Sequence, residues 1–224
     1  MVSIIVPVFN EEKNIKKIIT ALNSLEGEKE IIVVDGESQD NTFFYASSLV
    51  HTIKAKKGRA NQMNQGVKAS KGEIIWFVHA DSILEKDSIK NIEKAVSQGF
   101  VGGGFSIYFY DYQTLFMRYI TVTSNIRSKT TGLFYGDQGV FVKKDLFLKL
   151  GGFPEMELME DFKFSRMVKK AGRMKLLENT IGTSARRYKS GGQVRTHLLM
   201  HKIRILYFLG VSTSKLNKIY GEAR

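Results

Sequence analysis

Short runs of apolar residues alternate with amphipathic stretches through the first hundred residues of the chain. Three of these runs are continuous and rich in β-branched residues, at residues 2–9, 30–34 and 74–79. Between the first two, apolar side chains recur at helical spacing, at Ile15, Ile18, Ile19, Leu22 and Leu25. A strand, a helix and a strand in this order form a βαβ unit with a right-handed crossover, and near-continuous apolar strands suit a sheet covered on both faces. We therefore expect an α/β fold on a mostly parallel sheet flanked by helices.

The same patterns predict the remaining elements, with less regular alternation after residue 100. Asp40 is expected to cap a helix that runs to Leu49, and Gly58 is expected to open another. A further helix is expected to turn inward the side chains of Ile89, Ile92 and Val96. Strands are predicted at residues 50–53, 105–110 (directly after the glycines 102–104), 136–143, 174–177 and 180–188. Helices are predicted at residues 115–126, 146–150, 160–171 and 197–209, the last of them amphipathic.

Polar clusters follow the predicted strands at the points where these strands end. They lie at residues 7–12, 35–40, 56–59 and 79–81. In an open parallel sheet, ligands bind beyond the carboxyl ends of the strands. A single carboxylate after a strand is explained equally well as a cap of the next helix. Four clusters at one edge favour a ligand site.

Several chemistries are excluded or disfavoured by what the sequence lacks. The absence of cysteine excludes disulfides, thiolate metal sites and cysteine nucleophiles. There is no GxGxxG after the first strand, no Walker motif and no GxSxG nucleophile elbow. No run of roughly 20 apolar residues suggests a membrane-spanning helix, and the N-terminus lacks the basic stretch of a signal peptide. We expect a cytoplasmic protein.

The net charge of +12 indicates either simple solubility or an anionic partner. The excess is concentrated late in the chain, at Arg186, Arg187, Lys189, Arg195, Lys202 and Arg204. A basic amphipathic helix near the C-terminus would suit an anionic membrane surface, which predicts a peripheral position at the inner face of the membrane. Nucleic acid is disfavoured as a partner because no recognisable binding module is present.

Taken in order, these motifs resemble family-two glycosyltransferases with the GT-A fold. The resemblance rests on residues 3–12 (SIIVPVFNEE) and on Val34-Asp35-Gly36 with Ser38 and Asp40. His79-Ala80-Asp81 falls where that family has its DxD motif, and Glu160-Asp161 falls where it has an acidic ED motif. Residues 58–64 and 136–139 are similar to a small bacterial branch of these enzymes in which His-Ala-Asp replaces DxD.

The resemblance implies a nucleoside-diphosphate sugar as donor, an unknown hydroxyl acceptor and an inverting single displacement. Asp161 would be the general base, beside Glu160. The donor would be bound by Pro7, Asn10, Glu12, Asp35, Gly36, Arg59, His79, Asp81, Arg186 and Arg187. Among these, Asp35 would hydrogen-bond the base and Arg59 would lie near the base or ribose. A divalent cation, Mn²⁺ or Mg²⁺, would be held by Asp81 and His79 and would bridge the diphosphate.

Several of these assignments have alternatives that the residues leave open. An imidazole is a poor Mg²⁺ ligand, so metal binding would depend mainly on Asp81. His79 could instead be a histidine at a strand end whose ring nitrogens hydrogen-bond backbone groups. Glu160-Asp161 could be the acidic first turn of a helix. Asp137 and Gln138 could shape an acceptor pocket or a turn, and Arg186-Arg187 could bind phosphate or form a solvated strand end. Trp76, inside an apolar run, favours a core position over a sugar platform.

We expect one domain over residues 1–224, with a nucleotide-binding half at 1–100, an acceptor-side half at 101–190 and a helical extension at 191–224. The competing prediction is a nucleotide-binding or membrane-surface protein without transferase activity. The sequence does not identify the sugar, the base, the acceptor or the oligomeric state.

Overall fold

Eight strands form one sheet in the computed structural model, which describes residues 1–222. The strands are β1 (Val2–Val8), β2 (Lys29–Asp35), β3 (His51–Lys54), β4 (Ile74–Phe77), β5 (Ile83–Leu84), β6 (Gly102–Phe109), β7 (Phe141–Lys143) and β8 (Met174–Thr183). Their order across the sheet is β3-β2-β1-β4-β7-β6-β8-β5. The first four are parallel, β7 is antiparallel to both β4 and β6, β6 is parallel to β8, and β5 is antiparallel to β8. The predicted mostly parallel α/β sheet is confirmed.

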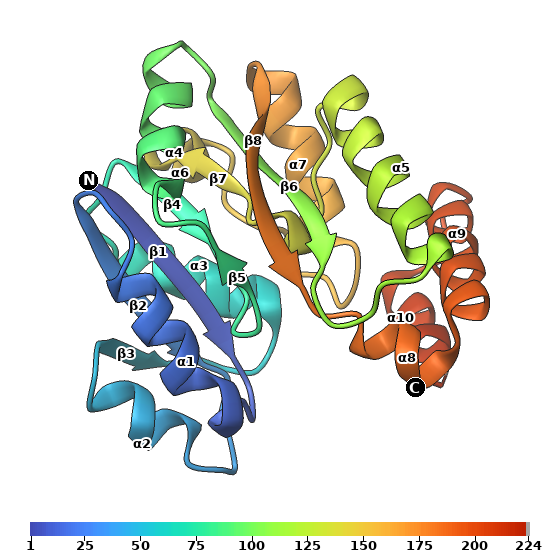
Figure 1. The fold of residues 1–224 in the computed structure, drawn as a ribbon, viewed down its shortest axis with the longest axis horizontal. Coiled ribbons are helices and arrows are strands. Elements are labelled where there is room, and N and C mark those ends of the chain that lie inside the picture. Colours follow the sequence, from blue (N-terminus) through green and yellow to red (C-terminus); the bar gives the residue numbers. More distant parts are fainter. Residues whose placement is uncertain (223–224) are drawn as a thin grey trace.

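Helices cover both faces of the sheet (Figure 1). One face packs against α1 (Glu12–Asn23), α2 (Thr42–Ser47) and α4 (Ser88–Ser97), and the other against α3 (Arg59–Ala69), α6 (Lys144–Lys149) and α7 (Glu160–Ala171). Successive residues of a strand point to opposite faces, so Ile4 and Val6 of β1 join the first cluster while Ile5 joins the second. Burial on both faces explains the continuous apolar runs.

The remaining helices lie on the β6 and β8 side of the molecule, with α5 packed along β6 and α8 following the end of β8 (Figure 1). They are α5 (Leu115–Thr131), α8 (Arg186–Gly191), α9 (Gln193–Phe208) and α10 (Thr213–Glu222). The sequence did not predict α10 or the two-residue strand β5. The expected amphipathic character of α9 is wrong, because its apolar side chains point both inward, as Ile203 does, and outward, as Leu198 does. Among residues 1–222, no helix combines the length and apolar content that crossing a bilayer requires.

Three predictions after residue 100 are corrected by the structure. The glycines 102–104 lie inside β6, where a Cβ on Gly103 would come within 2.0 Å of the Lys175 carbonyl oxygen. Residues 136–143 divide into a 3₁₀ turn (Gly136–Gln138) and β7, because Gly139 adopts a left-handed conformation with φ of 56°. Residues 174–188 form one strand, β8, followed by α8. The Asp111 carboxylate stops the strand by accepting hydrogen bonds from the Ala185 amide and the Ser184 hydroxyl.

Candidate active site

The carboxyl ends of β1 and β2 hold the first part of the site. Asp35, the last residue of β2, is 1% exposed. Its Oδ2 accepts a hydrogen bond from the Ser38 amide at 3.0 Å, whereas its Oδ1 has no donor among the described residues. Leaving a buried carboxylate oxygen without a donor costs free energy, so such an atom suggests a missing ligand group. Pro7 of the neighbouring β1 is partly exposed at the same edge.

Gln62 of α3 fixes the gap between these two strand ends. Its amide nitrogen donates to the Val8 carbonyl at 2.7 Å and to the Val34 carbonyl at 2.9 Å. A Cβ on Gly36 would lie 2.8 Å from this amide, so the close approach requires glycine at position 36. The sequence analysis assigned Gln62 no role. A signal was present, because an amide sits among the apolar side chains on the inner face of α3.

Within residues 1–222, three residues other than glycine have a positive φ, and all three lie next to the site. Asn10 follows β1 with φ of 54°, Glu37 follows β2 with φ of 65°, and Met159 precedes Glu160-Asp161 with φ of 70°. A left-handed conformation costs of order 1–3 kcal/mol for residues other than glycine and tends to persist at functional sites. The strained residues therefore support a site at this edge of the sheet.

Arg59 connects the end of β4 with the start of α7. Its Nη2 lies 2.6 Å from His79 Nε2, and its Nε lies 3.7 Å from Glu160 Oε1. Burial lowers the pKa of His79 to about 3, and the positive charges of Arg59 and Arg186 contribute to this lowering. The imidazole is therefore neutral at physiological pH and accepts a hydrogen bond from the guanidinium.

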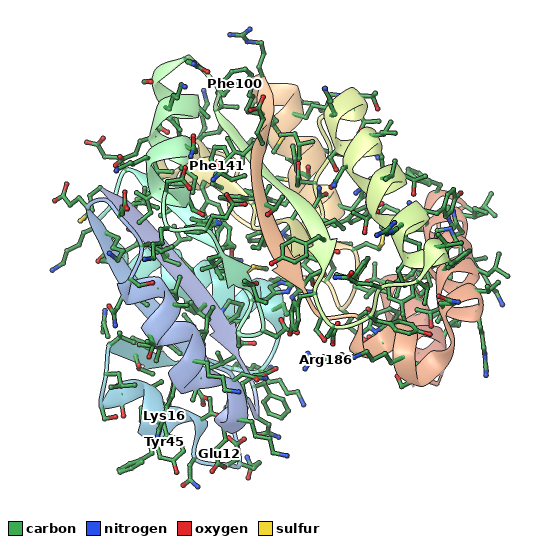
Figure 2. All side chains as sticks on the ribbon, in the orientation of Figure 1. Glu12, Lys16, Tyr45, Phe100, Phe141 and Arg186 are labelled. Carbon is green, nitrogen blue, oxygen red and sulfur yellow. The ribbon has the colours of Figure 1, made fainter. Side chains whose placement is uncertain are left out.

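A second arginine approaches the site from α8. Arg186 Nη2 lies 3.8 Å from Asp81 Oδ2 and 3.7 Å from Glu11 Oε1, and Figure 2 labels Arg186 beside α8. Asp81 follows β4 and Glu11 follows β1, so the arginine spans two strand ends. Tyr110, which the sequence analysis missed, hydrogen-bonds Ser184. Burial raises the pKa of Tyr110, and the negative charge of Asp81 adds to this.

Three carboxyl groups, of Asp161, Asp137 and Glu160, lie near Arg59. The Asp161 carboxylate accepts hydrogen bonds from the Gly136 amide at 2.8 Å and the Phe162 amide at 2.7 Å. Burial raises the pKa of Asp137, which Arg127 opposes and Asp161 reinforces. Burial also raises the pKa of Glu160, against the influence of Arg59 and with that of Asp161. Two backbone N–H groups therefore orient the Asp161 carboxylate. Burial favours the neutral forms of the two neighbouring groups, Asp137 and Glu160.

Some residues predicted to bind the donor are used within the protein. Asn10 Oδ1 accepts from the Gln39 amide, and both Glu12 carboxylate oxygens accept from Asn41. Glu12 is the first residue of α1, next to the Glu11 that contacts Arg186, so its hydrogen bonds and not its position keep it from the donor (Figure 2). The Arg187 guanidinium lies 4.0 Å from the centre of the Tyr220 ring. Thus Asp35, Gly36, Arg59, His79, Asp81, Glu160, Asp161 and Arg186 are brought together, whereas these contacts direct Asn10, Glu12 and Arg187 elsewhere.

The donor set beside Asp81 does not fit a resident Mg²⁺ or Mn²⁺ ion. These ions prefer six oxygen ligands or nearly so, with at least one or two carboxylates. Within residues 1–222, no group of three or more His, Asp or Glu side chains is placed to hold a metal ion. Arg59 engages His79 Nε2, and Arg186 faces Asp81. Metal binding by Asp81 and His79 stays a prediction that these contacts do not favour.

Trp76 is fully buried in β4, and its ring stacks on Phe105 with centroids 5.2 Å apart. Its predicted core position is confirmed.

Comparison with known proteins gives matches to one family. The sequence model of glycosyl transferase family 2 matches residues 3–146. Poly-beta-1,6-N-acetyl-D-glucosamine synthase of Staphylococcus epidermidis is 29% identical over 114 residues, which cover 46% of this chain and 28% of that protein. Dolichyl-phosphate beta-glucosyltransferase of Mus musculus is 32% identical over 114 residues, covering 42% of this chain and 35% of that protein. The chain therefore spans about a third of the length of these relatives or less.

Solved structures share the fold over most of the chain. The mannosyltransferase PcManGT from Pyrobaculum calidifontis, in complex with GDP-Man and Mn²⁺, superposes with a TM-score of 0.66 at 20% identity, covering 99% of this chain and 73% of that one. TarS of S. aureus, in complex with UDP-GlcNAc, gives a TM-score of 0.63 at 18% identity, covering 82% of this chain and 58% of that one. These likenesses confirm the expected fold.

Proposed function

Because this chain belongs to glycosyl transferase family 2, we propose that it transfers a sugar from a nucleoside-diphosphate donor to a hydroxyl acceptor. The fold is the GT-A fold of its structural neighbours. Relatives named as glycosyltransferases support the reaction class, and neighbours solved with UDP-GlcNAc and GDP-Man support a nucleotide-sugar donor. Membership of the family does not fix the acceptor, the stereochemical outcome or any membrane association, and these points are proposed separately below.

The unpaired Oδ1 of Asp35 is the observation that carries this proposal. A nucleobase at the carboxyl ends of β1 and β2 would donate a ring N–H or an amino N–H to this oxygen. A ligand N–H that bonds Asp35 Oδ1 would bind favourably, because this oxygen has already been removed from water in the folded protein. Pro7 and Gly36 would line the same pocket, and Gln62 holds the two strand ends in place.

The donor diphosphate would lie between Arg59 and Arg186. Guanidinium groups bind phosphate oxygens with two parallel hydrogen bonds, and both arginines already reach the end of β4. We propose that their charges stabilise the departing nucleoside diphosphate, so no step here passes through a metal ion. Asp81 and Glu11 hold Arg186 in position.

In the transfer step, the acceptor hydroxyl oxygen would bond to the anomeric carbon while the bond from that carbon to the diphosphate oxygen breaks. Asp161 would take the hydroxyl proton, and the electron pair would leave with the diphosphate. Attack opposite the leaving group inverts the anomeric centre. Glu160 and Asp137 would flank the acceptor, because both lie near Asp161.

A thermal-shift screen of nucleoside diphosphates and nucleotide sugars, with and without Mn²⁺, tests the proposal. A ligand at a hundred times its Kd stabilises the folded state by about 2.7 kcal/mol. For a chain of this size that corresponds to a rise in Tm of roughly 5–11 °C. Asp35→Asn should abolish the shift, because the amide of asparagine turns an N–H toward the base. Asp145→Asn, an exposed carboxylate of α6, is the matched control.

The competing function is nucleotide binding, or attachment to a membrane surface, without sugar transfer. The grouping of Asp161, Glu160 and Asp137 beside Arg59 favours the enzyme, since nucleotide binding alone needs no such carboxyl cluster. If no nucleotide stabilises the protein, both sugar transfer from a nucleotide donor and nucleotide binding without transfer are rejected. If a nucleotide sugar stabilises the protein but its sugar is neither released nor transferred to an acceptor, the protein binds nucleotides without being a transferase.

A further inference from the structure

Exposed apolar side chains are concentrated on two helices. Of the thirteen large hydrophobic residues exposed within residues 1–222, nine lie on α5, on α9 or directly after α9. They are Leu115, Tyr119, Val122, Ile126, Val194, Leu198, Ile205, Phe208 and Leu209. Single exposed apolar residues need no explanation, whereas a contiguous group indicates an interaction surface.

On α5 these side chains form one stripe along the helix. Leu115, Tyr119, Val122 and Ile126 are separated by four, three and four residues, and they are 84%, 53%, 54% and 55% exposed. This spacing places all four on one face. The opposite face, with Met117, is buried. A surface helix in water normally turns polar residues outward, so α5 lacks a partner on its outer side.

A second stripe runs along α9. Val194, Leu198, Ile205 and Leu209 are separated by four, seven and four residues, while Ile203 points inward. The two helices are neighbours (Figure 1), since the Thr114 hydroxyl donates to the Gln193 side chain at 2.6 Å. The eight residues of the two stripes are named here the α5–α9 face.

Exposed cations border both stripes. Arg118 and Lys129 lie beside the α5 stripe, each three residues after one of its members. Arg195 and Lys202 lie beside the α9 stripe, three residues before and four after Leu198. Neither residues 115–131 nor residues 186–221 contain any Asp or Glu. The two helices that carry the α5–α9 face therefore contribute cations and no acidic side chain to its rim.

We infer that the α5–α9 face binds the surface of an anionic lipid bilayer. Apolar side chains can enter the boundary between headgroups and acyl chains while the bordering Lys and Arg meet lipid phosphates and carboxylates. A nucleic acid would match the charge but leave the apolar stripes exposed. A second copy of the chain would cover the stripes but bring like charges together. The inference extends the proposed function by naming the surface on which an acceptor would be met.

Sedimentation of the full chain with vesicles tests this inference. Phosphatidylcholine vesicles with phosphatidylserine should bind the chain, and vesicles of phosphatidylcholine alone should bind it much more weakly. Replacing Leu115, Val122 and Ile126 together by Gln should lower binding about tenfold or more. The charge variant Arg118→Glu with Lys129→Glu should do the same. Three exposed apolar residues elsewhere, Phe44, Leu49 and Leu148, are replaced by Gln as the matched control.

Wild-type binding in the apolar variant, or equal binding to both kinds of vesicle, would overturn the inference. A wild-type dimer that the apolar variant converts to a monomer, without vesicle binding by either, would assign the face to a second copy. All variants should keep the nucleotide-induced thermal shift. Loss of that shift in every chain, including the wild type, with vesicle binding retained, would refute the proposed function and leave this inference standing.

Discussion

At the scale of single residues, the site consists of charged groups whose partners determine their state. Asp35 keeps one oxygen free because Ser38 takes only the other. His79 is held neutral beside Arg59. Asp81 faces Arg186, and Asp161 accepts hydrogen bonds from two backbone amides. This arrangement supports our proposal that some of these residues bind the donor and Asp161 accepts a proton.

Replacing Asp161 or Asp81 by Ala should strongly reduce transfer and leave the fold intact. Asp161→Ala removes the proposed base, which should lower the transfer rate by about 10²–10⁴-fold. Asp81→Ala releases Arg186 from the end of β4 and should weaken donor use. Transfer rates and circular dichroism measured on the same preparations check both effects. Full activity in both variants would remove these residues from the site.

The neutral state of His79 should be visible in the pH dependence of stability. The pKa of His79 falls from 6.5 to about 3 on folding, so the unfolded chain binds more protons below pH 6.5. The stability contributed by the neutral imidazole is complete above that pH and is lost as the pH falls toward 3. Urea midpoints at neutral pH and near pH 5 should therefore differ more in the wild type than in His79→Asn. Equal differences in the two proteins would place His79 in water.

If arginines neutralise the diphosphate, transfer should persist in EDTA. Arg186→Gln should lower kcat/KM by about 100-fold, since it removes a donor that acts on developing negative charge. Lys149→Gln, an exposed cation of α6, should have no effect. Rates with EDTA and with added Mn²⁺ make the comparison. Strict dependence on Mn²⁺ would return Asp81 to the role of metal ligand.

At the scale of elements, the regular first hundred residues were predictable and the irregular remainder was not. Apolar periodicity located β1, α1, β2 and β4, and the start of α3 at Gly58, because each packs on a continuous core. The left-handed conformation of Gly139 ends the 3₁₀ turn, and the hydrogen bond from the Ala185 amide to Asp111 ends β8. Local sequence propensity reports neither a single backbone conformation nor a contact between distant residues. Within the site, the strand-end carboxylates were predictable. The partners of Arg59 and Arg186 depend on tertiary contacts and were not.

The turn before β7 offers a test of how elements position the site. A Cβ on Gly136 would lie 2.3 Å from Arg59 Nη2 and 3.3 Å from Asp161 Oδ2. Gly136→Ala should push the flexible arginine away from His79 and lower transfer about tenfold or more, with a change in unfolding free energy of about 1 kcal/mol or less. Gly221→Ala, which meets open space, is the control. Unchanged kinetics would show that the Arg59 position does not matter.

At the scale of the whole molecule, charge is divided unequally along the chain. Residues 1–100 contain 13 Lys and Arg and 13 Asp and Glu, whereas residues 101–224 contain 21 and 9, so the net charge of +12 belongs to the second part. The neutral part supplies the strands below the proposed base pocket. The positive part supplies α8 and the α5–α9 face.

This division predicts that salt affects the two kinds of binding differently. Raising the ionic strength from about 0.1 M to about 1 M shortens the Debye length from roughly 10 Å to roughly 3 Å. Binding to anionic vesicles should fall steeply, because the contributing cations are exposed. Nucleotide affinity should fall less, since in our proposal Asp35, which is buried, binds a neutral base. Parallel titrations at both salt concentrations check this, and an equal loss would contradict the division.

The pairing of β5 with β8 has a consequence for how the protein is made. Ile83, two residues after Asp81, lies opposite Gly182, so nearly a hundred residues of sequence separate the two partners. Domains assemble from the N-terminus during synthesis, and the strands up to β4 can pair while later residues are still being added. The segment after Asp81 must wait until β8 has left the ribosome. A nascent chain can therefore acquire β1, β2 and β4 early, and the loop that carries Asp81 is fixed only after β8 has been made.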